Sequence, residues 1–153
     1  MLVDWTQKGA VAPTKNQGMC GGGAVFSTLG GVQSLSKIAT GTLQIFSEQQ
    51  LIDCVYGCSG GLANSGYKYY QSHCKKISYL AVCTPSEYPY TGRQGTCQNV
   101  ACKFKISGFK TVATCDDLAK TIMSQPVSVA VDASKWSTYA SGVFSNCATA
   151  INH

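Results

Sequence analysis

Residues 11–27 read VAPTKNQGMCGGGAVFS, and they give the strongest indication of how the chain folds. It contains Pro13, the run Asn16-Gln17-Gly18 and three consecutive glycines from Gly21 to Gly23, all of which interrupt regular structure. Residues 1–22 are therefore predicted to be loop and extended chain. Because glycine has no side chain, the three glycines also let another backbone or a ligand come close to the segment that follows.

A central helix is predicted directly after the glycines. Apolar residues recur at helical spacing along one side of this stretch: Val25, Leu29, Val32, Leu35, Ile38 and Ala39. Gly41 stands where a C-terminal cap belongs. This is the most apolar helical stretch of the chain, so we expect it to form the centre of the core.

Two further helices are predicted in the first half. Ser47-Glu48-Gln49-Gln50 has the pattern of a capping box, in which Ser47 caps the helix and the side chain of Gln50 reaches back. This short helix is expected to run to about Cys54. A third helix is predicted from Leu62 to about Cys74, with its tyrosines as a packing face.

The last third of the chain is predicted to turn from helix to strand. Thr114 to Asp117 is another capping signal, and the helix that it opens is expected to end before Pro126. After the proline, Val127, Val129 and Val131 alternate with small or polar residues. A period of two is typical of a half-buried strand.

The composition indicates one ordinary globular domain. The chain has 153 residues, of which 44% are apolar and 12% charged, and its net charge is +5. No apolar run reaches the roughly 18 residues of a membrane helix, so no membrane span is expected. The basic residues are scattered and Arg93 is the single arginine, which argues against a nucleic-acid partner.

Cysteine is the unusual component. There are nine, at positions 20, 54, 58, 74, 83, 97, 102, 115 and 147. The spacing of Cys54 and Cys58 is allowed for zinc, but no second matching knuckle follows. Disulfides are therefore favoured over a metal site, and we expect no metal. Because nine is odd, at least one cysteine lacks a partner within the chain.

Several separated segments together fit one known pattern. They are Val3-Asp4-Trp5, residues 11–27, residues 47–61 (SEQQLIDCVYGCSGG), Tyr88-Pro89-Tyr90, residues 126–129 and Ile151-Asn152-His153. In order and spacing the chain resembles the papain family of cysteine peptidases, most like its cathepsin L branch. The resemblance implies an α+β fold. It has a mostly helical left domain over residues 1–103 and the beginning of a β-barrel right domain over residues 104–153, with the C-terminal part of the barrel absent.

The resemblance also assigns catalytic positions. Gln17 matches the glutamine of the oxyanion hole, and His153 matches the catalytic histidine. The family reads Gln-Gly-x-Cys-Gly-Ser-Cys-Trp where this chain reads Gln-Gly-Met-Cys-Gly-Gly-Gly-Ala. The nucleophile therefore falls on Gly23 and the bulky residue after it on Ala24, while Cys20 matches a structural half-cystine. A glycine supplies no attacking atom, so peptidase activity is not expected.

The substrate groove is expected to survive in part. Gly60 and Gly61 match the edge that hydrogen-bonds a substrate backbone, and Leu62, Ala63 and Ala130 match walls of a pocket for an apolar side chain. A peptide or protein segment is thus the expected ligand. No cofactor is implied.

Two disulfides follow from the resemblance, Cys20–Cys58 and Cys54–Cys97. The remaining non-core cysteines, at 74, 83, 102 and 115, allow three pairings. Cys74–Cys83 and Cys102–Cys115 are favoured because they close short local loops without crossing the family bridges. Such bridges imply an oxidising compartment, either extracellular or the endolysosomal lumen.

Cys147 leads to a further expectation. A half-built barrel exposes unpaired strand edges and one apolar face. We therefore expect a continuation of the polypeptide, a cleaved second chain or an assembly neighbour to complete the barrel, with Cys147 bridged to it. The orienting asparagine of the family would also lie there.

Three functional hypotheses remain open at this point. In the first, the chain is a papain-fold pseudoprotease with a binding or structural role, which the changes at Gly23 and Ala24 together support. In the second, it is a cathepsin L-type endopeptidase whose chain is mutated, misread or incomplete. A cysteine-rich metal module is the third, and it would need bound zinc and reduced thiols.

Overall fold

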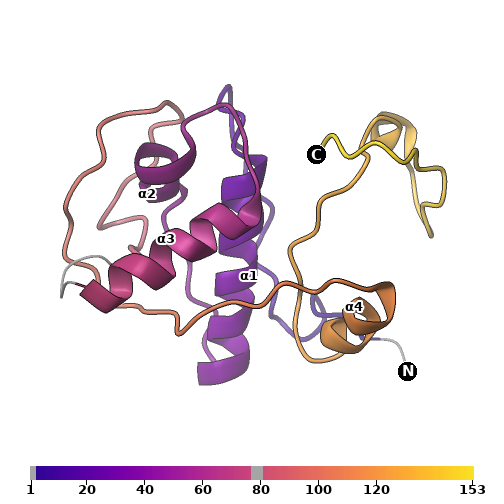
Figure 1. The fold of residues 1–153 in the computed structure, drawn as a ribbon, viewed down its shortest axis with the longest axis horizontal. Coiled ribbons are helices and arrows are strands. Elements are labelled where there is room, and N and C mark those ends of the chain that lie inside the picture. Colours follow the sequence, from indigo (N-terminus) through magenta and orange to yellow (C-terminus); the bar gives the residue numbers. More distant parts are fainter. Residues whose placement is uncertain (1–2, 77–80) are drawn as a thin grey trace.

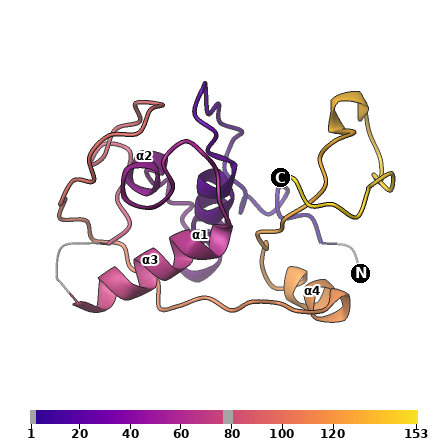
Figure 2. The same cartoon turned by 45° about the horizontal axis from the view of Figure 1, so that its top comes forward.

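The computed structural model describes residues 3–76 and 81–153, and only the backbone of residues 73–76. Three helices, α1, α2 and α3, lie together, and α4 with the C-terminal residues lies on the opposite side of α1 (Figures 1 and 2). Long extended segments join the two parts. None of the described helices is long and apolar enough to cross a membrane.

The predicted central helix is confirmed as α1 (Gly23–Thr40), whose Val25, Leu29 and Val32 are fully buried. Gly41 caps it in the left-handed conformation, with φ of 77°, and its N–H donates to the carbonyl of Lys37. The apolar side is buried only over its first part. Leu35 and Ile38 are 37% and 43% exposed, because helices α2 and α3 pack against the earlier turns.

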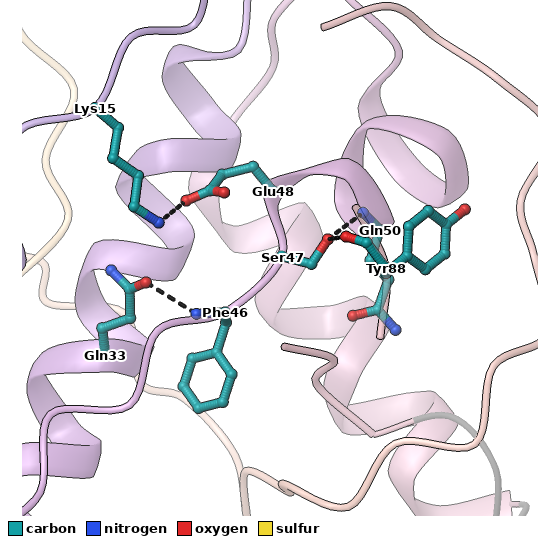
Figure 3. A network of polar contacts seen from close by, with 7 residues as sticks. All are labelled: Lys15, Gln33, Phe46, Ser47, Glu48, Gln50 and Tyr88. Atoms are coloured by element: carbon teal, nitrogen blue, oxygen red, sulfur yellow. Dashed lines mark hydrogen bonds and ion pairs between the residues drawn. The ribbon is translucent and has the colours of Figure 1, made fainter. Parts of the chain in front are cut away.

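The second predicted helix begins at its expected cap but is shorter than expected. It is α2 (Glu48–Leu51), followed by a π-helical turn at Ile52–Tyr56. Ser47 Oγ accepts from the N–H of Gln50 at 3.2 Å and donates to the carbonyl of Tyr88 at 2.6 Å (Figure 3). The cap is therefore confirmed, and Ser47 also ties α2 to a distant loop.

The reach-back of Gln50 is wrong. The N–H of Ser47 donates instead to the carbonyl of Cys83, at 2.8 Å. The buried amide of Gln50 bonds residues 81–83, donating to the carbonyl of Ala81 and accepting from the N–H of Cys83. That buried backbone lies outside any ladder and must find hydrogen-bond partners, so it takes the side chain that the capping box would have used.

Helix α3 (Ala63–Lys76) packs across α1 and carries Tyr70, which is completely buried. The main core contains the following buried residues: Cys20, Val25, Leu29, Val32, Phe46, Leu51, Ile52, Tyr70 and Val82. A second, smaller cluster holds Ala81, Cys83, Tyr88 and Cys102. The tyrosines of α3 thus form a packing face, as predicted.

The predicted fourth helix is confirmed as α4 (Cys115–Ile122), ending before Pro126. Thr114 caps it by accepting from the N–H of Asp117 at 3.1 Å. Trp5 Nε1 donates to the carbonyl of Ile122 at 2.8 Å, which holds the N-terminal segment beside α4. A short 3₁₀ turn follows at Trp136–Thr138.

The alternating segment after Pro126 is extended, but within the described residues it forms no regular strand. Val129 is 54% exposed, so the predicted half-buried alternation is wrong. Val131 is the one residue of this segment with a backbone partner in the described part of the chain, because it exchanges hydrogen bonds with His153. A regular strand needs a partner strand for its backbone and a packed layer on one face, and here the backbone partner covers one residue.

Two predicted disulfides are confirmed, Cys20–Cys58 and Cys54–Cys97. The predicted pairs Cys74–Cys83 and Cys102–Cys115 are wrong, because Cys83 bonds Cys102. The N–H of Val82 donates to the carbonyl of Phe104, and this long-range bridge brings residues 83 and 102 together.

The other cysteines divide into two groups. Cys115 and Cys147 are exposed and free, whereas the side chain of Cys74 lies outside the described residues. Cys54 and Cys58, which had a spacing allowed for zinc, are both in disulfides. The described residues contain no cluster of three or more metal-binding side chains.

Candidate functional site

The three glycines before and at the start of α1 have different steric environments. A Cβ at Gly21 would lie 2.7 Å from the carbonyl oxygen of Cys58, a distance that the fold cannot accommodate. At Gly22 it would lie 3.0 Å from the ring of Phe26, which is tight. At Gly23 it would meet only the imidazole of His153, at 3.6–3.7 Å, which is ordinary van der Waals contact. The fold therefore requires glycine at 21 but not at 23.

Gln17, Gly23 and His153 lie around one cavity of about 570 Å³. Its walls come from residues 11–15, from the first three turns of α1, and from residues 126–129. The positions that the resemblance named are separated by up to 136 residues of sequence, yet the fold brings them together. The described lining includes no cysteine.

Gln17 is held firmly at the mouth of α1. Its Oε1 accepts from the N–H of Gly22 at 3.1 Å, and its backbone carbonyl accepts from the hydroxyl of Tyr90 at 2.7 Å. Tyr90 also packs edge-on against Phe26. Burial, with a smaller contribution from Glu48, raises the pKa of Tyr90, so its hydroxyl stays a donor. Among the described residues, Gln17 Nε2 has no hydrogen-bond partner and can serve a ligand.

His153 stands opposite Gly23 because its backbone pairs with Val131. The N–H of Val131 donates to the carbonyl of His153 at 2.8 Å, and the N–H of His153 donates back at 3.0 Å. The imidazole is exposed and meets the edge of Trp136, with ring centroids 6.1 Å apart. An imidazole in this position can exchange a proton with a group bound beside Gly23.

Asp132 secures the segment that carries His153, a role that the sequence reasoning missed. Its carboxylate accepts from the N–H of Ala148, the N–H of Ser134 and the side-chain amide of Asn152. These hydrogen bonds, led by the one from Ala148, lower the pKa of Asp132 to about 2. The available signal was an acidic residue inside an apolar alternating stretch, in a chain with only seven acids.

The predicted substrate-contacting residues lie outside this cavity. Its lining contains neither Gly60 to Ala63 nor Ala130. The tyrosine hydroxyl of Tyr56 donates to the carbonyl of Leu62 at 2.8 Å, and Thr28 Oγ1 donates to that of Ala63 at 3.0 Å. Leu62 itself is 61% exposed. Helix α1 and Tyr56 therefore fix the backbone at Leu62 and Ala63, while the side chain of Leu62 stays open to solvent.

The charged groups of the cavity wall are paired. Glu48, the one acid in the described lining, is buried and forms an ion pair with Lys15 (Figure 3). Beneath it, Gln33 Oε1 accepts from the N–H of Phe46 at 3.1 Å. The wall therefore presents no unpaired carboxylate to a ligand.

Comparisons with known proteins place the chain in a family. The family model described as papain family cysteine protease matches residues 1–153. The chain therefore belongs to the papain family, and its relatives include cathepsin L-like enzymes. It is 39% identical over 163 residues to vignain of Vigna mungo and 36% identical over 160 residues to cathepsin L 1 of Paramecium tetraurelia.

The solved structures agree with this assignment. The bromelain protease of Ananas comosus, solved in complex with the E64 inhibitor, superposes with a TM-score of 0.86 at 35% identity. That match covers 99% of this chain and 71% of the bromelain chain. The chain spans 43% of the vignain sequence and 49% of the cathepsin L 1 sequence, with 99% of itself aligned to each. The papain-like α+β fold, with a helical left domain and a partial right domain, is thereby established.

Proposed function

We propose that this chain is a papain-fold pseudoprotease, which holds a peptide or protein segment in its cleft without cleaving it. The observation that carries the proposal is Gly23 at the N-terminus of α1, facing His153 in a cavity whose described lining has no thiol. Peptide cleavage of the papain type needs a thiolate at that place, stabilised by the helix and an adjacent imidazole. Gln17 and the backbone N–H of Gly23 remain as donors for a carbonyl oxygen, but nothing attacks the carbonyl carbon.

Neither Cys20 nor water makes a good substitute nucleophile. Cys20 is buried and bonded to Cys58, so it offers no thiolate. A water activated by His153 would gain only the general-base contribution of about 10²–10⁴-fold, which is small against the barrier to peptide hydrolysis. Replacement of the bulky neighbouring position by Ala24 is a second change at the same place, and it supports a site that no longer performs the chemistry.

The edge from Gly60 to Ala63, at which Leu62 is 61% exposed, suits an extended peptide. Gly60 and Gly61 would offer backbone groups to the ligand, and Leu62, Ala63 and Ala130 an apolar contact for one side chain. The three disulfides suit an oxidising compartment, and we propose the extracellular space or the endolysosomal lumen.

The test combines a thiol-directed epoxide with a labelled peptide. The epoxide is expected to leave residues 16–37 unmodified in peptide maps, and dipeptide fluorogenic substrates are expected not to turn over. A fluorescent peptide with an apolar residue should bind, by anisotropy, and be recovered intact. The variant Gly23→Cys should gain one epoxide at residue 23 and yet hydrolyse little, because Ala24 remains. Labelling within the cavity of the unmodified chain, or cleavage of the peptide, would refute the proposal.

The second candidate is a cathepsin L-type endopeptidase whose chain is mutated, misread or incomplete. The observation in its favour is that a side chain at residue 23 would fit against His153 without strain.

We further propose that a continuation, a second chain or an assembly neighbour covers the apolar side chains of residues 126–153, since Val143 is 96% and Ile151 68% exposed. Mass spectrometry of the natural protein under non-reducing conditions tests both points. It gives the residues at 18–27 and shows whether Cys147 is bridged to another segment.

A further inference from the structure

Ser128 joins three segments that are far apart in the sequence. Its Oγ donates to the carbonyl of Ser27 in α1 at 2.8 Å, across 101 residues of sequence. The same Oγ lies 2.9 Å from the hydroxyl of Tyr67 in α3. Among the described residues, these are the only hydrogen bonds that join helices α1 to α3 to residues 111–153.

The direction of both hydrogen bonds follows from their partners. A backbone carbonyl only accepts, so the single hydrogen of Ser128 points to Ser27. Tyr67 must then donate to Ser128, which requires a neutral tyrosine. Burial raises the pKa of Tyr67, and the hydroxyl therefore stays protonated across the ordinary pH range. Tyr67 therefore donates to Ser128, and Ser128 donates to the carbonyl of Ser27.

Gly31 makes the room for this junction. A Cβ at residue 31 would fall on the hydroxyl of Tyr67 and would lie 3.7 Å from Ser128 Oγ. Any side chain there would push Tyr67 away from Ser128. The ring of Tyr67 also stacks on Phe109, with centroids 5.7 Å apart.

The hydrogen bonds of Ser128 connect, through the backbone, to residues on both sides of the cavity. Ser27 lies about one helical turn after Gly23, and Ser128 lies three residues before Val131. Val131 pairs with the backbone of His153, whose imidazole faces Gly23 across the cavity. The contact of Ser128 with α1 is therefore linked, through a short stretch of backbone, to the segment that carries the imidazole.

We propose that Ser128, with Tyr67 and the space left by Gly31, is a positioning residue that sets the place of His153 against the N-terminus of α1. The proposal rests on the proposed function, since it concerns the cavity in which a ligand would bind. It assigns no chemistry to Ser128 itself.

A thiol introduced by Gly23→Cys reports the position of the imidazole. A helix N-terminus and an adjacent imidazolium both lower the pKa of a thiol from its usual value of about 8.5. We expect the rate of alkylation by iodoacetamide, followed against pH and mapped to residues 16–37, to show a lowered midpoint. Adding His153→Ala gives the midpoint that the helix alone produces, which is the limit without an imidazole.

In the Gly23→Cys background, Ser128→Ala should move the midpoint upward toward the His153→Ala limit. A rise of about one pH unit would lower the thiolate fraction about tenfold in the range below the midpoint. Gly31→Ala should act in the same direction, and Tyr67→Phe less, because Ser128 keeps its bond to Ser27. Ser124→Ala is the matched control, since Ser124 Oγ donates only to Thr121 within its own segment, and it should leave the midpoint unchanged.

Three results would overturn the proposal: no effect of His153→Ala, a shift with Ser124→Ala as large as that with Ser128→Ala, or unchanged midpoints in both Ser128→Ala and Tyr67→Phe. If Ser128→Ala fails to fold, as judged by circular dichroism and the Cys20–Cys58 bridge, Tyr67→Phe decides alone. Peptide binding by the unmodified chain is measured separately. Its absence would refute the proposed function without altering the thiol midpoints, so the two failures are distinguishable.

Discussion

Replacing Ser47 by alanine tests whether the short helix α2 is anchored by the hydrogen bonds of one buried hydroxyl. Ser47 is 2% exposed, and its Oγ serves both the N–H of Gln50 and the carbonyl of Tyr88 (Figure 3). Loss of a serine cap costs about 1 kcal/mol of stability. A buried carbonyl left without its donor adds about 1–3 kcal/mol. We therefore expect Ser47→Ala to lower the free energy of unfolding by about 2–4 kcal/mol.

Ser34→Ala is the matched control for this prediction. Ser34 is 3% exposed, lies in the same helical core, and donates only to the carbonyl of Gly30, one turn earlier in α1. That carbonyl keeps its helical backbone partner when the hydroxyl is removed, so nothing is left unsatisfied. Since alanine is also the better helix former, Ser34→Ala should cost about 0–0.5 kcal/mol.

Urea denaturation followed by circular dichroism, with the disulfides intact, measures both variants. With a denaturant slope of about 2 kcal/mol per molar, Ser47→Ala should shift the midpoint down by about 1–2 M from that of the unmodified chain, and Ser34→Ala by about 0.25 M or less. Equal shifts for the two variants would refute the reasoning. The cost would then come from removing a buried serine and not from the two groups that Ser47 satisfies.

Two further predictions concern the site. Asp132 has a folded-state pKa lowered to about 2, so its contribution to stability is present above about pH 4 and is lost as the pH falls toward 2. Asp132→Asn should abolish this acid transition in Trp136 fluorescence. A transition of the same size in both proteins would contradict the prediction. Gly21→Ala should lower the melting temperature by several degrees, because its Cβ would lie 2.7 Å from a backbone oxygen. Gly23→Ala should change it by about 1 °C or less, and a similar loss in both would show that the two glycines are not sterically distinct.

Local signals predicted the helices well. Ser47 and Thr114 each cap a helix because the cap depends on residues within four positions of one another. The apolar spacing of α1 and the glycine after it are equally local. Burial of the second half of α1 was not predictable in this way, because it depends on which helices reach those turns. The division of the chain at residues 103 and 104 stays a prediction.

Pairings between distant residues were the weak point. The preference for short disulfide loops failed at Cys83. The backbone bridge between Val82 and Phe104 places Cys83 beside Cys102, which is distant in sequence. In the same way, the alternation of Val127 to Val131 is a local pattern, but burial of one face requires a partner strand. Ser128 lies in a segment of the family pattern but was assigned no role, and Asp132 lies in none of those segments. Their importance appears only when Ser27 and Ala148 lie beside them.

Under the proposed function, the cavity keeps its geometry although Gly23 offers no attacking atom. The start of α1 is fixed by the Cys20–Cys58 bridge and by the backbone bond from Gly21 to Cys58. His153 is held by its backbone hydrogen bonds with Val131 and by the hydrogen bond from the neighbouring Asn152 to Asp132. None of these contacts uses a side chain at residue 23. A change of side chain at residue 23 therefore has almost no structural cost, whereas a change at Gly21 disturbs the loop that positions the helix. Loss of chemistry and loss of fold are therefore separable at this site, and the steric difference between two neighbouring glycines is the physical basis of that separation.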